Sequence, residues 1–249
     1  MKSSVFVGCA IALVAIAGCN SKQGQAATNA AAKRAHATAP KTRDWTQVVS
    51  PTAAGGFVMG NPNAKVKLIE FGSLTCPHCK HFDDEGVPHL LGYVKSGQVS
   101  WEFRNYVRDA FDVTAALIAR CNGAKDFFPL TRAIYKEQPD WEAKIEATPQ
   151  DQLKSMQDLP TNQEFVALAK VAAFAKLAAE HGLPPAKANQ CLASEKSADQ
   201  LVQMAENATT QFPDFPGTPT FVINGKMVPN VATWDGLEPA LKKALGERG

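Results

Sequence analysis

Cys76 and Cys79 are separated by two residues, Pro77 and His78, at the start of a segment with helical character. At this spacing the first sulfur lies at the open N-terminal end of the helix and the second about one turn further in, close enough to bond. The free N–H groups and the positive end of the helix dipole stabilise a thiolate, so Cys76 is predicted to be the nucleophile and leaving group. The pattern predicts a reversible dithiol switch.

The residues between the cysteines favour the same chemistry. Pro77 suits the first helical turn because its missing N–H would have had no intrahelical partner. His78 can add charge or hydrogen bonding to the Cys76 sulfur. Stabilising the thiolate favours the reduced pair, which makes the disulfide a stronger oxidant.

Three other uses of this cluster fit its residues less well. A zinc site that includes His81 would pack four ligands into six consecutive residues, which cannot readily surround a tetrahedral ion. Attachment of a c-type haem requires histidine directly after the second cysteine, where this chain has Lys80. A purely structural disulfide would close so short a loop that it would constrain the unfolded chain little.

The elements that must position the dithiol can be expected from periodicity. An apolar run over residues 65–71 predicts a buried strand, residues 77–95 a helix, and the alternation over 98–107 a half-buried strand. Strand, helix and strand in succession imply a right-handed crossover between parallel strands.

The rest of the chain divides into a helical block and a second strand region. Residues 112–211 are expected to be helical, with Thr161 and Glu164 forming a capping box ahead of an alanine-rich helix over 162–181. Strands are expected at 220–223 and 227–228, joined by a tight Asn-Gly hairpin. A final helix carries Leu237, Leu241 and Leu245.

Two motifs together resemble those of the DsbA-like disulfide oxidoreductases of the thioredoxin superfamily. Residues 68–79, Leu-Ile-Glu-Phe-Gly-Ser-Leu-Thr-Cys-Pro-His-Cys, are similar to the family's active-site strand and helix start, and 217–221, Gly-Thr-Pro-Thr-Phe, to its second active-site loop. The resemblance spans roughly Phe57 to Leu245. It implies an α/β thioredoxin fold, βαβ followed by ββα, with an all-helical insertion.

The resemblance assigns roles to individual residues. Cys76 matches the attacking cysteine, Cys79 the resolving cysteine, and His78 the residue that stabilises the thiolate. Pro219 matches a cis proline that faces the disulfide, where a cis bond would leave the backbone of Thr218 free to pair with an extended substrate. An ordinary trans proline beside Gly217 is the alternative.

Glu70 lies six positions before Cys76 and matches a buried acid beneath the active site that helps to move protons. A surface charge at a strand end is the alternative for the same residue.

The direction of electron flow is less constrained than the fold. Oxidases of the family often carry valine before the cis proline, whereas this chain has Thr218, a residue common in related isomerases and reductases. The expected function is oxidation of exported proteins through a mixed disulfide at Cys76, with a quinone-linked membrane partner of the DsbB type restoring the disulfide. A reductase or isomerase of the same fold and a tethered peptide-binding chaperone are the alternatives. The resemblance implies no cofactor beyond the redox-active disulfide, and no metal.

The N-terminus has the composition of an export signal. A short positive start, an apolar run over residues 5–17 and the Ile-Ala-Gly-Cys ending at Cys19 resemble a bacterial lipobox, in which the cysteine becomes the lipid-bearing first residue. Cleavage by the general signal peptidase is the alternative. Residues 20–42 contain no apolar side chain larger than alanine, as a flexible tether would. We expect a periplasmic protein anchored at Cys19, with the outer membrane slightly favoured because Asn20 follows that cysteine.

The expected organisation is a lipoprotein signal peptide at 1–18, a flexible linker at 19–47, the thioredoxin fold at 48–111 and 212–249, and the helical insertion at 112–211. A formal net charge of +2, with basic and acidic residues interspersed, gives no reason to expect a nucleic acid partner.

Four cysteines remain once Cys9 is removed with the signal and Cys19 is lipidated, and four cysteines allow three pairings. With Cys76 and Cys79 committed to exchange, Cys121 and Cys191 are expected to form a structural disulfide inside the helical block. Two buried free thiols are the alternative.

Overall fold

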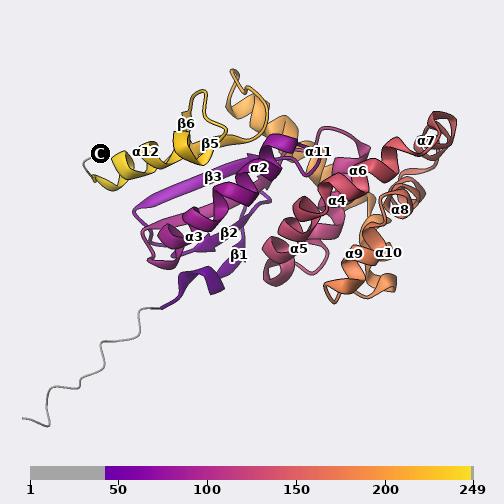
Figure 1. The fold of residues 1–249 in the computed structure, drawn as a ribbon, viewed down its shortest axis with the longest axis horizontal. Helices are drawn as coiled ribbons and strands as arrows, with labels where there is room; N and C mark the ends of the chain where they lie inside the picture. The colour runs from indigo at the N-terminus through magenta and orange to yellow at the C-terminus, as the bar shows by residue number, and fades with distance from the viewer. Residues whose placement is uncertain (1–42, 248–249) are drawn as a thin grey trace, which may run out of the picture. The chain divides into compact units, whose positions relative to one another are not determined.

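The computed structural model describes residues 43–247. Their centre is a six-stranded sheet in the order β1-β2-β4-β3-β5-β6 (Figure 1). Only β3 and β4 run parallel, and the other neighbours are antiparallel. The strands are β1 (Val49–Pro51), β2 (Phe57–Gly60), β3 (Val66–Gly72), β4 (Val99–Asn105), β5 (Thr220–Ile223) and β6 (Lys226–Val228).

Helices occupy most of the remaining chain. A short 3-10 helix η1 (Trp45–Gln47) precedes β1, α2 (Pro77–Glu85) and α3 (Val87–Lys95) connect β3 to β4, and α12 (Trp234–Leu245) ends the fold. Between β4 and β5 lie α4 (Ala110–Arg120), α5 (Ala124–Lys136), α6 (Gln138–Glu146), α7 (Gln150–Gln157), α8 (Thr161–Val171), α9 (Phe174–Glu180), α10 (Pro185–Leu192) and α11 (Glu195–Gln211). The expected fold class, a thioredoxin-type α/β sheet with a helical insertion, is confirmed. The boundaries expected for the domains remain interpretations of the sequence.

The alternation of side chains along β3 separates two apolar clusters. Leu68 lies in the main core, which also contains residues of α2, α3, α12 and the insertion. Phe71, on the opposite face, packs with Val222 and Ala208 and against the half-buried ring of Phe215. Period-2 geometry therefore puts Glu70 on the same face as Leu68, toward the main core.

Two helices expected to be continuous are interrupted. The expected helix over 77–95 breaks at Gly86 because Pro88, in the first turn of α3, has no N–H to donate to the preceding turn. The alanine-rich helix over 162–181 divides into α8 and α9 at Ala173, whose φ of 56° lies in the left-handed region.

The capping box expected from Thr161 and Glu164 is not formed. Pro160 occupies the N-cap position of α8, and no side chain caps this end. Thr161 is already the first helical residue, because the extended backbone at Pro160 shifts the helix start by one position. The backbone N–H of Glu164 bonds instead to the Pro160 carbonyl.

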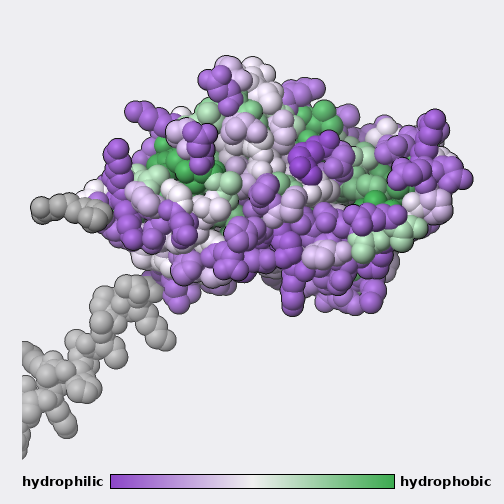
Figure 2. Space-filling model, turned by 45° about the horizontal axis from the view of Figure 1, so that its top comes forward, coloured by the Kyte–Doolittle hydropathy of each residue, from purple (hydrophilic) through white to green (hydrophobic). Residues whose placement is uncertain are grey.

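The surface of the described chain is largely polar. Figure 2 shows mostly hydrophilic side chains on one face, with apolar areas interrupted by polar ones. Within residues 43–247, the exposed large hydrophobic residues are Leu159 and Val202. None of the described helices has both the length and the apolar character needed to cross a membrane.

A disulfide joins Cys121, at the C-terminal end of α4, to Cys191 in α10. The two residues are 70 positions apart. In the chain-entropy description, opening a loop of this size removes about 4 kcal/mol of stability.

We therefore expect Cys121→Ala/Cys191→Ala to lower the free energy of unfolding by roughly 2 to 4 kcal/mol, measured by urea denaturation. Thiol exchange at Cys76 should persist in the folded variant. Equal stability of the variant and the parent would show that this bond is absent from the folded protein in solution.

Candidate active site

The dithiol lies where the sequence pattern places it, at the start of α2. Cys76 is the N-cap residue, with an extended backbone, and Pro77 is in the first turn. Cys79 follows one turn later and is fully buried, while Cys76 is 2% exposed. Both are free thiols in this structure, which is therefore the reduced form.

The two sulfurs differ strongly in acidity. The pKa of Cys76 is lowered to about 5, mainly by the hydrogen bond from the Cys79 side chain. Burial acts in the opposite direction. The Thr218 side chain and the backbone N–H groups of Cys79 and His78 lower the pKa further. The pKa of Cys79 is raised well above its usual value, mainly because burial disfavours its charged form. Cys76 is thus the thiolate at neutral pH and Cys79 its proton-bearing partner.

His78 and Pro77 both face solvent. The effect of His78 on Cys76 in this structure comes from its backbone N–H, which helps to lower the pKa of the thiol. Pro77 starts the helix without blocking a hydrogen bond.

The second half of the site comes from the loop before β5. The Thr218–Pro219 peptide bond is cis, and Gly217 before it has a φ of 118°, a conformation that favours glycine. The Cys76 thiol donates to the carbonyl oxygen of Thr218 at 3.2 Å. The Thr218 hydroxyl is buried and has no hydrogen-bond partner in this structure, and the Thr218 side chain helps to lower the pKa of Cys76.

This contact has a chemical consequence. When Cys76 ionises or forms a mixed disulfide, it loses the proton that it shares with the Thr218 carbonyl. That backbone oxygen is then free to accept an N–H from an extended peptide.

Glu70 is buried rather than exposed at a strand end. It is 2% exposed on β3, and its carboxylate accepts a hydrogen bond from the Trp101 indole N–H at 3.0 Å. Burial, followed by the charge of Asp83, raises the pKa of Glu70 to about 8. Glu70 therefore carries a proton at neutral pH, and its charged form raises the pKa of Cys79.

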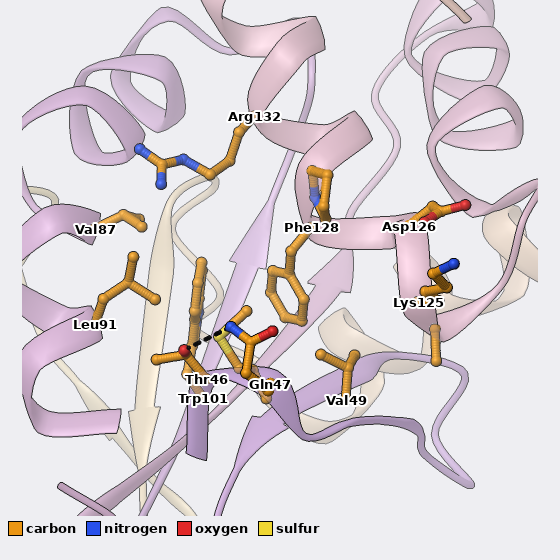
Figure 3. Close-up of a pocket in the computed structure, with 13 residues that line it drawn as sticks. Thr46, Gln47, Val49, Val87, Leu91, Trp101, Lys125, Asp126, Phe128 and Arg132 are labelled. Atoms are coloured by element: carbon orange, nitrogen blue, oxygen red, sulfur yellow. Dashed lines mark hydrogen bonds between the residues drawn. The ribbon is translucent and has the colours of Figure 1, made fainter. Parts of the chain in front are cut away.

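A cleft of about 820 Å³ opens between η1, α3 and α5 (Figure 3). Its wall is formed largely by Val87, Leu91, Trp101 and Phe128, with Arg132 at one side. Neither thiol lines this cleft in the described chain. Trp101 links this cleft to the dithiol site, because it lines the cleft and its indole N–H donates a hydrogen bond to Glu70.

We expect the free energy of unfolding of the oxidised protein to depend on pH through the protonation of Glu70. Between pH 4.5 and about 8 the folded carboxyl keeps a proton that the unfolded chain releases, so the free energy of unfolding should fall as pH rises through this window. Glu70→Gln keeps an acceptor for Trp101 but cannot ionise, so it should remove this slope.

The variant should therefore exceed the parent in stability by up to roughly 5 kcal/mol above pH 8. Urea denaturation of both oxidised proteins at pH 5, 7 and 9 measures this difference. Parallel pH profiles would show that Glu70 ionises normally in the folded state.

Several buried polar residues near the dithiol were not singled out from the sequence. Asp112 lies in the first turn of α4 and is fully buried. Asp83 in α2 is 6% exposed and lies 3.5 Å from Arg132 of α5. Acidic residues are common in the first turn of surface helices, where they interact favourably with the helix dipole. The sequence therefore carries no signal that Asp112 is buried.

The remaining predicted residues lie elsewhere. Cys121 and Cys191 belong to the helical insertion, and Cys19 is outside the described residues. Residues 43–247 contain no group of three or more His, Cys, Asp or Glu side chains arranged to hold a metal ion.

Known proteins are similar to this chain in both sequence and fold. The profile of a thioredoxin family matches residues 52–243. A relative from Rickettsia felis, named as a candidate protein-disulfide oxidoreductase, is 28% identical over 194 residues, which cover 77% of this chain and 61% of the relative. The match thus spans about three fifths of that relative's length.

Solved structures match a similar share of the chain. A protein-disulfide isomerase from Novosphingobium aromaticivorans is 33% identical with a TM-score of 0.72, covering 76% of this chain and 97% of that one. Wolbachia pipientis alpha-DsbA1 has the same fold, with a TM-score of 0.63 at 20% identity over 79% of this chain and 94% of that one. This chain belongs to the thioredoxin family, and its fold is that of the DsbA-like structures.

Proposed function

We propose that this protein is a dithiol oxidase that transfers the Cys76–Cys79 disulfide to cysteine pairs of exported proteins. The observation that carries the proposal is the position of Cys76 at the N-cap of α2, beside Cys79 and Thr218, whose contacts lower its pKa to about 5. A folded state that stabilises the thiolate stabilises the reduced pair, so reduction of the protein, and hence oxidation of the client, is favoured.

The site supports both steps of the exchange. A client thiolate attacks the Cys76 sulfur, the Cys76–Cys79 bond breaks, and the buried Cys79 sulfur takes up a proton for which Glu70 is the nearby donor. The second client thiolate then attacks the client sulfur of the mixed disulfide, forming the client disulfide and releasing Cys76 as a stable thiolate. Two electrons pass from the client dithiol to the protein pair.

A protein-disulfide isomerase is the second candidate, favoured by the name of the Novosphingobium relative and by Thr218 ahead of the cis proline. An isomerase must start from the reduced form, which an acidic Cys76 also stabilises. The two functions therefore differ in the redox state in which a partner protein maintains Cys76 and Cys79, oxidised for an oxidase and reduced for an isomerase.

The proposed location is the periplasm, with the chain anchored through a lipid on Cys19. The apolar run, the lipobox-like ending and the tether-like composition of residues 20–42 support this placement. An oxidising compartment also lets the disulfide form persist. A DsbB-type membrane protein is the proposed oxidant that restores the pair.

Refolding assays separate the two functions. The oxidised protein should restore activity to reduced ribonuclease, and the reduced protein should do little for scrambled ribonuclease. Efficient rescue of the scrambled enzyme together with weak oxidation of the reduced enzyme would contradict the oxidase and support the isomerase.

A further inference from the structure

The loop Ser73–Thr75, which joins β3 to the N-cap of α2, is held by side chains that come from beyond β4. The Asp112 carboxylate accepts from the Leu74 backbone N–H at 2.8 Å and from the Ser73 hydroxyl at 2.6 Å. It also accepts from the Arg108 backbone N–H at 3.1 Å. One buried carboxylate therefore ties the loop to the start of α4.

The carbonyl groups of the loop are bound by three further side chains. The Tyr135 hydroxyl of α5 donates to the Ser73 carbonyl at 3.1 Å, and the Gln138 amide of α6 donates to the Leu74 carbonyl at 2.7 Å. The Arg108 guanidinium donates to the Thr75 carbonyl at 2.8 Å. Each loop carbonyl thus has a donor that lies 33 to 64 residues later in the chain.

Apart from the exposed bond between Arg108 and Thr75, these contacts are shielded from water. Ser73, Leu74 and Asp112 are fully buried, and Tyr135 and Gln138 are 1% and 2% exposed. A buried amide or hydroxyl that loses its partner pays a desolvation cost, so the loop has little freedom to move without breaking several bonds.

The same loop contacts both cysteines. The Ser73 carbonyl accepts from the Cys76 backbone N–H at 3.2 Å, and the Ser73 N–H donates to the Cys79 sulfur at 3.5 Å. The groups that lower the pKa of Cys76 are the Cys79 thiol, the Thr218 side chain and the first backbone N–H groups of α2. Their aim at the Cys76 sulfur depends on where the loop places the N-cap.

We infer that the helical insertion tunes the reactivity of Cys76 by fixing the Ser73–Thr75 loop, with Asp112, Tyr135 and Gln138 as positioning residues. The insertion is thus a part of the active site as well as a cover for it. This inference rests on the proposed exchange function only in that Cys76 is its nucleophile.

Charge and position must be separated in the test. Removing the Asp112 carboxylate would change the local charge as well as the loop, so its effect on a thiolate would mix two causes. Tyr135→Phe and Gln138→Met remove one donor each, keep the volume nearly constant and leave the charge at neutral pH unchanged. Tyr93→Phe is the matched control, because the Tyr93 hydroxyl also donates one hydrogen bond, at 3.0 Å, but to Glu238 in α12.

The measurement is the pH titration of the Cys76 thiolate by absorbance near 240 nm in the reduced, full-length proteins. Each variant should raise the pKa of Cys76 by roughly half a unit and the double variant by about one unit, which is about a threefold and a tenfold increase in the affinity of the thiolate for its proton. The control should shift it by less than about 0.2 units. Tyr135→Phe deletes a single oxygen atom and should still fold. It can therefore test the inference even if Gln138→Met does not fold.

A folded variant that loses thermal stability but keeps the parental pKa of Cys76 would overturn the inference, since the network would then be only structural. A shift as large in Tyr93→Phe would overturn it as well. The proposed oxidase function fails on a different result, the inability of the unmodified protein to oxidise reduced ribonuclease, and the comparison of thiolate pKa values stands whether or not that occurs.

Discussion

Cys76→Ser is expected to reduce disulfide transfer to the rate of the uncatalysed reaction. Every route through the site passes through the Cys76 sulfur, which is the acidic member of the pair and the one that contacts the Thr218 carbonyl. Serine keeps the size of the side chain but forms no disulfide and is not ionised at neutral pH. Oxidation of reduced ribonuclease, followed as recovered activity, measures the loss.

The control for this variant is Cys121→Ala/Cys191→Ala, which removes two cysteines from the insertion and leaves the dithiol intact. It should retain transfer. Residual catalysis by Cys76→Ser above the uncatalysed rate would mean that Cys79 or another thiol can act as the nucleophile. The complete burial of Cys79 argues against such a role for that residue.

Cys79→Ala is expected to convert the protein into a trap for its clients. Cys76 can still attack a client disulfide, but Cys79 can no longer attack the Cys76 sulfur to free the client, so the mixed disulfide persists wherever no second client thiolate reaches it. Because the thiolate of Cys76 is stabilised, external thiols should release the client by attack at the client sulfur, with Cys76 leaving. Non-reducing electrophoresis of exported proteins from cells that make the variant should show mixed disulfides that the parent protein does not accumulate.

The matched control for the trap is Cys76→Ser/Cys79→Ala, which should form none of these adducts. Adducts formed equally by this double variant would assign them to another cysteine of the chain. Rapid clearance of the Cys79→Ala adducts, at the rate of the parent protein, would contradict the role of Cys79 as the resolving thiol.

The sequence predicted the parts of the site that are fixed by local chemistry. The spacing of Cys76 and Cys79 and the position of Pro77 determine where the helix starts, whereas the burial of Glu70 was expected only from the family resemblance. The Asn-Gly pair likewise predicts the β5–β6 hairpin, which the structure contains. The cis bond before Pro219 came from the family resemblance, not from these local patterns.

Features that depend on tertiary contacts were missed. The strands β1 and β2 are short, and β2 acquires its place by pairing with β4, some 40 residues later. The breaks at Gly86 and Ala173 interrupt segments whose composition is compatible with continuous helices. The loop network around Asp112 joins residues from separate elements, and a single sequence carries no signal of that juxtaposition.

A titration of the protein against glutathione buffers at pH 7 tests the central claim, that the Cys76–Cys79 pair is an oxidant, most directly. The fraction of reduced protein is read from trapped thiols by mass spectrometry. An oxidising pair should be half reduced at a potential well above that of the glutathione couple, near the range of about −120 mV known for strong oxidants of this chemistry. A midpoint near −270 mV, the value typical of reducing thioredoxins, would contradict the account.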